Sequence, residues 1–402
     1  MRIYFKLSFK IHLSSRRKVP ALKFAFLIFK YFPFGGMQRD MLRTAQHLVK
    51  QGHQVEIFTM RWQGDSPVDI AVHVMPQTGW LNYQRYQKFI HAAFEHITQN
   101  NFDYIFGYNR MQGLDAHFAA DPCFIERAHT QRSFWYRLLP RYRWFTACEK
   151  AVFDANSATE ILAVSLTEKP HFQHWYATQD GRFHYIPPFL SSERLQLHDK
   201  TEMRAHLRQS FHFDAEDFVF LLTGSGFHMK GLDRAIIALA ALPYEQRRNT
   251  RLIAVGQDNP RDFERLSKQL GVTEHVVISK GRPDIPQLMQ GADVCIHPAR
   301  RENTGLVILE GMASDTPMLV TETCGYAHYV QEANAGIVCS APYQQADFNA
   351  LFAEMRMSSA KTRSQWGQNG HAKAMTLMQE NDGSAEANIL IRLAQRKKLS
   401  NT

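Results

Sequence analysis

Two glutamates, Glu302 and Glu310, bracket a short glycine-containing segment that follows the apolar run 294–297. If a helix begins at Thr304, Glu310 lies on its second turn while Glu302 stays in the loop, roughly 10 Å away. This gap is too long for a paired general acid and base, but it suits a site that holds two hydroxylated sugars. The spacing alone is weak evidence, and its place at the end of a predicted strand strengthens it.

Two adjacent glycines, Gly35 and Gly36, stand between the apolar run 23–30 and a predicted helix at 38–51. In open α/β sheets, ligands bind at the carboxyl ends of the strands, and glycines there let backbone N–H groups approach a phosphate. A tight turn between strand and helix would use the same residues. The pair therefore indicates either an anion site or a simple turn.

The second half of the chain repeats this arrangement, with Gly224, Gly226 and Lys230 after the apolar run 218–223. Met229 stands where the dinucleotide-binding fingerprint needs its third glycine, which disfavours a nicotinamide-dependent dehydrogenase. Lys230 could instead meet a diphosphate and offset the charge that grows on a leaving group. A solvated surface lysine is the alternative.

Few other residues indicate chemistry. The sequence contains no Asp-x-Asp motif, and its five cysteines are scattered without metal-ligand spacing. We therefore expect no metal and no cofactor. Asp121 follows Ala119 and Ala120 beyond the predicted strand 104–108, where it is either an acid that faces a cleft or a solvated loop residue.

Residues 124–150 interleave basic and aromatic side chains. This composition suits a segment that lies in the headgroup region of an anionic membrane. It would also stack on single-stranded nucleic acid, and an ordinary amphipathic helix packed on its own domain would have the same pattern. The residues that we expect to associate with the membrane are Arg132, Trp135, Arg137, Arg141, Arg143 and Trp144.

Strand-length apolar runs alternate with helical stretches, which is typical of parallel sheets covered on both faces. The chain has 402 residues and is 45% hydrophobic, which is enough for two cores. Pro187 and Pro188 interrupt the pattern and separate two doubly wound units. The predicted strands are 23–30, 54–59, 104–108, 161–165, 218–223, 252–255, 276–279, 294–297 and 318–321.

The formal net charge of +9 suits anionic partners such as phosphates, acidic lipid or nucleic acid. The longest apolar run near the start, residues 24–29, is far shorter than the roughly 20 residues that span a bilayer. Residues 1–22 are basic and lack the features of a signal peptide, so we interpret them as an extension. The scattered cysteines fit a reducing cytosol.

The chain resembles the lipopolysaccharide core glucosyltransferase I group of glycosyltransferase family 4. The resemblance implies the GT-B fold, in which two Rossmann-like, doubly wound α/β domains face a central cleft. We expect residues 23–188 to form the acceptor-side domain, 189–375 the nucleotide-sugar domain, and 376–402 a helix that packs back on the first domain. The similar residues are the run 30–40, the pair Ala120 and Asp121, the run 324–329, and Glu302 with Glu310.

This resemblance also implies an activity. The family transfers glucose from UDP-glucose to a heptose of the lipopolysaccharide inner core, with retention of anomeric configuration, at the cytoplasmic face of the bacterial inner membrane. The implied partners are a nucleotide sugar, the inner core and an anionic membrane surface, but not nucleic acid. We expect a monomer. The expected catalytic residues are Glu302, Asp121 and Lys230.

The resemblance assigns roles within the nucleotide-sugar site. Gly36 and Lys230 would meet the diphosphate, Glu302 the transferred sugar and Glu310 the ribose, while Asp121 would lie near the acceptor. The full set expected to bind the nucleotide sugar is Gly35, Gly36, Asp40, Arg194, Gly226, Lys230, Glu302, Gly305, Leu306 and Glu310.

Three departures from the family pattern bear on donor choice. Met229 replaces an arginine, for which Arg300 or Arg301 is the candidate substitute. Phe189 replaces a glycine, and Asn303 and Thr304 replace small residues. Another UDP-sugar or another glycolipid acceptor is therefore the nearest alternative. A non-catalytic membrane-surface scaffold is the alternative of another class.

Overall fold

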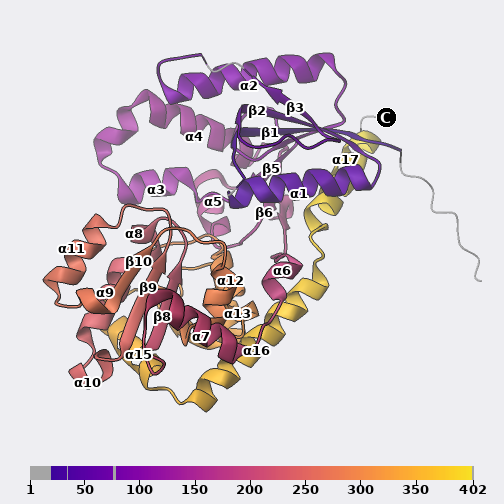
Figure 1. The fold of residues 1–402 in the computed structure, drawn as a ribbon. Coiled ribbons are helices and arrows are strands. Elements are labelled where there is room, and N and C mark those ends of the chain that lie inside the picture. The colour runs from indigo at the N-terminus through magenta and orange to yellow at the C-terminus, as the bar shows by residue number, and fades with distance from the viewer. Residues whose placement is uncertain (1–19, 34, 76–77, 401–402) are drawn as a thin grey trace, which may run out of the picture.

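The structure is a computed structural model that describes residues 20–33, 35–75 and 78–400. It contains two parallel sheets, one in each half of the chain, with helices on both faces of each sheet (Figure 1). The predicted α/β class and its two doubly wound units are confirmed. Most of the predicted N-terminal extension, residues 1–19, lies outside the described residues, and Leu22 is already buried in the first core.

The first sheet has seven parallel strands in the order β3-β2-β1-β4-β5-β6-β7. The four strands predicted in this half are all present, with small shifts at their ends. The other three were missed because they are short and have no long apolar run. The strands are β1 (Lys23–Tyr31), β2 (Gln54–Trp62), β3 (Ala71–Val74), β4 (Tyr104–Gly107), β5 (Ala116–Ala119), β6 (Glu160–Ala163) and β7 (Phe183–Tyr185).

Helices bury both faces of this sheet. They are α1 (Gly36–Lys50), α2 (Asn82–Gln99), α3 (Phe124–Gln131), η1 (Phe134–Leu138), α4 (Pro140–Phe153), α5 (Lys169–Tyr176) and η2 (Asp180–Arg182). The predicted helix 38–51 is confirmed as α1. One core cluster joins Phe24 and Phe26 of β1 to Leu48 of α1, and a second joins Phe58 of β2 to Phe89 of α2.

The second sheet has six parallel strands in the order β10-β9-β8-β11-β12-β13. The five predicted strands are all confirmed, and the short edge strand β13 was missed because its first residue is a glycine. The strands are β8 (Phe218–Thr223), β9 (Thr250–Val255), β10 (Val276–Ser279), β11 (Val294–His297), β12 (Met318–Thr321) and β13 (Gly336–Cys339).

The helical elements of the second half alternate with these strands. They are α6 (Ser192–Leu195), α7 (Lys200–Phe211), α8 (Phe227–Lys230), α9 (Leu232–Ala241), α10 (Tyr244–Arg247), α11 (Arg261–Gln269), η3 (Thr273–His275), α12 (Ile285–Gly291), α13 (Leu306–Ala313), α14 (Ala327–Ala333) and α15 (Gln345–Met357). Two apolar clusters, one on each face of the sheet, join these helices to the strands.

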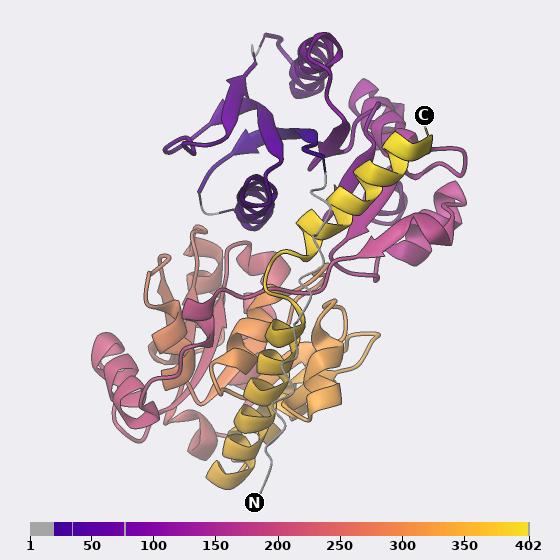
Figure 2. The ribbon, with the colours of Figure 1, turned by 90° about the vertical axis from the view of Figure 1, so that its right-hand side faces the viewer.

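The chain returns to the first half through its last two helices, α16 (Ala360–Glu380) and α17 (Ala385–Ser400) (Figure 2). α16 packs on α13 of the second half, whereas α17 packs on α1 of the first half. Ala387 and Leu390 of α17 belong to the same buried cluster as Phe24 of β1. The last helix therefore completes the core of the first half.

The two points at which the chain crosses between the halves are bonded to each other. The Asn381 side-chain amide, between α16 and α17, donates to the carbonyl oxygens of Pro187 at 2.9 Å and Pro188 at 3.2 Å. Asn381 is buried, so these bonds form away from bulk water. The domain limits at residues 188 and 375 stay predictions.

Candidate active site

A cleft of about 500 Å³ lies where the carboxyl ends of the second sheet's strands face the start of α1. Its walls come from the turns after β8, β9 and β10, from the loop after β11, and from α13. Parallel strands place their carboxyl ends at one edge of the sheet, which gathers residues that are distant in the sequence. The predicted nucleotide-sugar residues that line the cleft are Gly36, Arg194, Lys230, Glu302, Gly305, Leu306 and Glu310.

Cationic side chains outnumber carboxylates in this cleft. The charged residues that line it are Arg39, Arg194, Lys230, Arg282, Glu302 and Glu310. Positive charge in a concave site attracts anionic ligands and raises their local concentration. The cleft is therefore suited to a ligand that carries phosphate.

The Glu302 carboxylate forms an ion pair with the Lys230 ammonium group. Nε2 of the buried His297 lies 3.7 Å from the same carboxylate oxygen. Burial alone would raise the pKa of Glu302, but His297 and Lys230 lower it to about 2. Burial lowers the pKa of His297, whereas its contact with Glu302 opposes that shift. Glu302 is thus suited to hold hydroxyl groups and not to carry protons.

The loop that carries Glu302 packs against the run 324–329. The Gly325 N–H donates to the Glu302 carbonyl oxygen at 3.0 Å, and the Tyr326 N–H donates to that of Thr304 at 2.8 Å. A Cβ atom at Gly325 would lie 1.9 Å from the Asn303 carbonyl oxygen, so a larger residue would displace the loop. Two separate sequence patterns therefore form one structural unit.

Glu310 projects from α13 into the cleft, eight residues after Glu302. The helix begins at Leu306, slightly later than predicted, because Gly305 takes a left-handed conformation with φ of 78°. Nη1 of Arg194 lies 3.5 Å from the Glu310 carboxylate. The first residues of α13 line the cleft, so the positive end of the helix dipole faces it.

Gly35 and Gly36 have different functions in the turn after β1. A Cβ atom at Gly35 would lie 1.9 Å from Oε1 of Gln38 and 2.8 Å from the Phe32 ring, so a larger residue would require these side chains to move. A Cβ atom at Gly36 would meet nothing within 4 Å, and Gly36 lines the cleft whereas Gly35 does not. The surroundings of Gly36 thus leave room for a ligand, and its role as an anion site stays a prediction.

A second cavity of about 190 Å³ adjoins the cleft, and Gly36 and Glu302 line both. Asp40 lines this smaller cavity, where its Oδ1 lies 2.8 Å from Nη1 of Arg43. Burial raises the pKa of Asp40, while the charge of Arg43 opposes the rise. Asp40 is thus close to the cleft but not part of its lining, and its predicted contact with the donor stays a prediction.

Glu386 was missed by sequence reasoning. It extends from α17 into the first half and lines the smaller cavity with Asp40. The Tyr108 hydroxyl donates to its Oε1 at 2.5 Å. Burial and the charge of Asp40 raise the pKa of Glu386 to about 8, although the bond from Tyr108 lowers it. No local signal marks this residue, because an acid in the first turn is typical of many helices.

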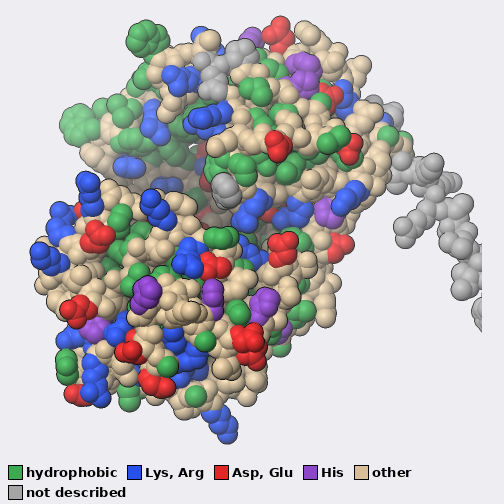
Figure 3. All heavy atoms as spheres, in the orientation of Figure 1, with side chains coloured by type: hydrophobic (Ala, Val, Ile, Leu, Met, Phe, Trp, Pro, Cys, Tyr) green, Lys and Arg blue, Asp and Glu red, His purple; other side chains and the backbone are tan. Residues whose placement is uncertain are grey.

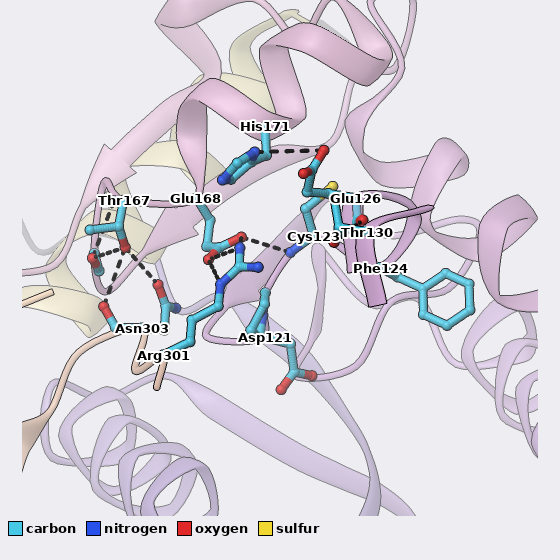
Figure 4. A network of polar contacts seen from close by, with 12 residues as sticks. Asp121, Cys123, Phe124, Glu126, Thr130, Thr167, Glu168, His171, Arg301 and Asn303 are labelled. Carbon is cyan, nitrogen blue, oxygen red and sulfur yellow. Dashed lines mark hydrogen bonds and ion pairs between the residues drawn. The ribbon is translucent and has the colours of Figure 1, made fainter. Parts of the chain in front are cut away.

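Among the described residues, Gly35, Gly226 and Asp121 were predicted for the site but line neither cavity. The Gly226 N–H donates to Oδ2 of Asp258 at 2.6 Å and therefore shapes the loop after β8. Asp121 is exposed, and its carbonyl oxygen accepts a hydrogen bond from Arg110 at 2.7 Å. In Figure 4 the Asp121 carboxylate points away from the surrounding hydrogen bonds. Its catalytic role stays a prediction.

Comparison with known proteins decides the family. The lipopolysaccharide glucosyltransferase WaaG of Escherichia coli (strain K12) is 37% identical over 352 residues, which cover 88% of this chain and 94% of WaaG. The chain belongs to glycosyltransferase family 4. A family model described as Glycosyltransferase Family 4 matches residues 34–194, and one described as Glycosyl transferases group 1 matches residues 203–373.

Solved structures show the fold of this family 4 chain. The crystal structure of WaaG, a glycosyltransferase involved in lipopolysaccharide biosynthesis, has a TM-score of 0.83 at 36% identity and covers 91% of this chain and 99% of WaaG. The structure of Anabaena Alr3699/HepE in complex with UDP and glucose has a TM-score of 0.67 at 19% identity, covering 95% of this chain and 100% of HepE. The predicted GT-B fold is confirmed, and the protein is a WaaG-like glycosyltransferase.

In this family 4 enzyme, the two candidates to replace the arginine expected at Met229 are both paired with acids. The Arg300 guanidinium donates to both carboxylate oxygens of Asp233, at 2.8 and 2.6 Å. Arg301 pairs with Glu168 of the first half. Both guanidinium groups are therefore already engaged, and neither lines the cleft. The expectation that one of them supplies the missing charge stays a prediction.

Arg39 and Arg282 are the arginines of this family 4 cleft that sequence reasoning missed. Arg282 follows the predicted strand β10. Because ligands bind at the carboxyl ends of the strands in open α/β sheets, this position could have been predicted for the site. Arg39 lies within the run 30–40 but was not singled out. Its side chain is exposed in the first turn of α1, beside Gly36.

The basic aromatic segment of the glycosyltransferase forms α3, η1 and α4 at one corner of the first half, where hydrophobic and basic side chains gather (Figure 3). Phe134 and Trp135 are 63% and 73% exposed. Arg137 and Trp144 are half-buried, and the Trp144 ring lies 5.8 Å from that of Tyr86. The exposed members of the predicted membrane-associating set are Arg132, Trp135, Arg141 and Arg143.

Within the ranges that the structure describes, no helix combines the length and apolar character needed to cross a bilayer. One group of possible metal ligands occurs there, Glu56, His73 and His96, whose ligand atoms lie within 4.8 Å of one another. Sequence spacing missed this group because it joins β2, β3 and α2. The Glu56 carboxylate is already held by Lys23 at 2.8 Å and His73 at 2.7 Å, so we interpret it as an ion-pair network. None of these residues lines either cavity.

Proposed function

We propose that the protein transfers glucose from UDP-glucose to a heptose of the lipopolysaccharide inner core, with retention of the anomeric configuration. The observation that carries this proposal is the cleft into which Lys230, Glu302 and Glu310 converge from separate turns. The 37% identity to a lipopolysaccharide glucosyltransferase supports the choice of sugar and acceptor.

The donor diphosphate would lie between the starts of α1 and α13, where two helix dipoles present their positive ends. Gly36 leaves space for a phosphate to approach the backbone, and Lys230 supplies an ammonium group. Glu310 would accept hydrogen bonds from the ribose hydroxyls, and Glu302 from the hydroxyls of the transferred sugar. HepE, which shares the fold, was crystallised with UDP and glucose.

The transfer breaks the bond between the anomeric carbon and the diphosphate oxygen and forms a bond from the same carbon to an acceptor hydroxyl oxygen. The acceptor approaches on the face from which UDP departs, which retains the configuration, and its proton passes to a phosphate oxygen. Lys230 and the first N–H groups of α13 stabilise the charge of the leaving UDP. Glu302, with a pKa of about 2, stays anionic and orients the sugar.

The acceptor is anchored by lipid, so the first half has to approach a membrane surface. Phe134 and Trp135 are exposed on η1, between Arg132 at the end of α3 and Arg141 on α4. Aromatic rings enter the headgroup region while arginines meet acidic lipids, a combination that binds membranes peripherally. We place the enzyme at the cytoplasmic face of the bacterial inner membrane.

The test is UDP release by the purified protein, supplied with truncated lipopolysaccharide that ends in inner-core heptose. UDP-glucose, UDP-galactose and UDP-N-acetylglucosamine are offered separately, and the anomeric configuration of the product is read by NMR. We expect turnover with UDP-glucose only when acceptor is present, and none with Glu302→Ala. Turnover with another donor alone would reject glucose. A folded protein that turns over no donor would reject this acceptor and favour a scaffold.

A further inference from the structure

A buried carboxylate links the two halves beside the cleft. Glu168 precedes α5 in the first half, and its side chain is only 7% exposed. Arg301 of the second half donates through Nη2 to both of its oxygens, at 2.6 and 2.7 Å, and through Nε at 3.1 Å. The Cys123 backbone N–H donates to Oε2 of Glu168 at 2.9 Å (Figure 4). One carboxylate therefore holds a loop from each half.

Both loops carry residues predicted to work in catalysis. Arg301 directly precedes Glu302, and Cys123 lies two positions after Asp121. On the other side of Glu302, the Asn303 side-chain amide donates to the Ala120 carbonyl oxygen at 2.6 Å. The residues on both sides of Glu302 are thus tied to the two ends of the loop that carries Asp121.

The loop of Asp121 is also held from within its own half. The Arg110 guanidinium donates to the carbonyl oxygens of Asp121 at 2.7 Å and Pro122 at 2.8 Å, and it pairs with the fully buried Glu149 at 2.5 Å. This loop is therefore a fixed part of the first half. The bonds to Arg301 and Asn303 then determine where the loop of Glu302 lies relative to it. A two-pronged arginine–carboxylate pair with little exposure is strongly directional.

We propose that Glu168 is a positioning residue, which through Arg301 fixes the loop of Glu302 against the loop of Asp121 when the two halves close on the substrates. This proposal rests on the proposed function. Donor binding uses residues that lie mostly in the second half, so it does not require the pair. Alignment of the donor sugar with the acceptor, and exclusion of water from between them, does require it.

The test compares Glu168→Gln, Arg301→Met and the double variant. Glu168→Gln keeps a side-chain oxygen that can accept from the Cys123 N–H while removing the charge. We expect kcat to fall about ten- to a hundredfold in each single variant, as for a small misplacement of reacting groups. The Kd for UDP should change less than about twofold. The double variant should be no slower than the slower single variant, because both changes break the same interaction.

A second measurement separates positioning from loss of stability. UDP-glucose that reacts with water gives free glucose, and the ratio of free to transferred glucose should rise in both variants. Arg204→Met is the matched control. Arg204 pairs with Asp293, a carboxylate that is also 7% exposed and also accepts a backbone N–H, but both residues lie in the second half. Arg204→Met should leave the ratio of free to transferred glucose unchanged.

An unchanged ratio in Glu168→Gln and Arg301→Met, or effects that multiply in the double variant, would overturn the proposal. A wild-type protein that transfers no glucose would instead reject the proposed function. In that case small-angle scattering of the UDP-bound proteins still tests the link. We expect a larger radius of gyration for Glu168→Gln and Arg301→Met than for the wild type and Arg204→Met, and equal radii would overturn it.

Discussion

The ammonium group of Lys230 and the carboxylate of Glu302 pair with each other in a cleft that both of them line. A bound diphosphate would compete with Glu302 for this ammonium. The exchange would leave the anionic Glu302 facing the sugar hydroxyls. The contact between Lys230 and Glu302 would thus link the phosphate and sugar ends of the donor.

Removal of the Lys230 charge should slow the chemical step. Lys230→Met takes away a donor aimed at the charge that develops on UDP, and loss of one such donor typically costs about 10²- to 10³-fold in kcat. The measurement is kcat for transfer at saturating UDP-glucose. Lys200→Met is the matched control, because Lys200 pairs with Asp315 at 3.0 Å outside the cleft. Equal kcat values in the two variants would contradict the role.

Glu310 should act on the nucleotide. Glu310→Gln weakens hydrogen bonds to the ribose, and a bond to a charged group contributes about 1.5–3 kcal/mol. We therefore expect the Kd for UDP, measured by calorimetry, to rise tenfold or more while the melting temperature stays within a few degrees. An unaltered Kd for UDP would show that the carboxylate binds something else, such as Arg194 alone.

A side chain at Gly36 should block the donor without disturbing the fold. A Cβ atom there meets no protein atom within 4 Å, and the residue lines the cleft. Gly36→Val should therefore raise KM for UDP-glucose at an unchanged melting temperature. Gly325→Ala is the contrasting variant, because its Cβ would lie 1.9 Å from a carbonyl oxygen and should lower the melting temperature. If Gly36→Val unfolds the protein, Gly36 serves the turn and not the ligand.

Glu386 should make stability depend on pH. Its pKa is raised from the ordinary 4.5 to about 8, so the unfolded chain loses the proton first. The contribution of this group is complete below pH 4.5 and is lost as pH rises towards 8, by at most about 1.4 kcal/mol per pH unit. Glu386→Gln should abolish that slope between pH 5 and 8 in urea unfolding. A slope that matches the wild type would show that Glu386 is ionised in the folded protein.

Exposed aromatic residues should govern membrane binding. The double variant Phe134→Ser, Trp135→Ser removes two large side chains from η1 and should weaken binding to vesicles of anionic lipid by about tenfold or more. Transfer to a lipid-free acceptor fragment should be unaffected. Tyr244→Ser is the control, since Tyr244 is comparably exposed, at 68%, in the second half. Equal vesicle binding by all three proteins would remove the membrane role from this surface.

The long strands and the turns that follow them could be predicted from the sequence. Continuous apolar runs mark β1 and β8, which are buried on both faces, and glycines mark the turns. Short strands such as β5 and β7 escaped because a run of three or four residues that includes histidine has no distinctive pattern. Their pairing with longer neighbours makes them strands, and that information is not local.

The site could be predicted where its residues lie in turns after predicted strands, as for Lys230 and Glu302. It could not be predicted where a residue arrives from a distant element. Glu386 reaches the smaller cavity from the last helix, and Glu168 meets Arg301 across 133 positions of sequence. Gly226 is a related case, because the amide of this residue, which was expected to bind the nucleotide sugar, donates to Asp258 instead.

The position of α17 has a consequence for the order of synthesis. Strand β1 is made near the beginning of the chain, yet Ala387, Leu390 and Ala394, which cover the same core cluster as Phe24 and Phe26, are made more than 350 residues later. On the ribosome, the first half therefore stays open on one side until the second half has been completed. The first half is synthesised before the second half, but it cannot complete its folding before the second half has been made.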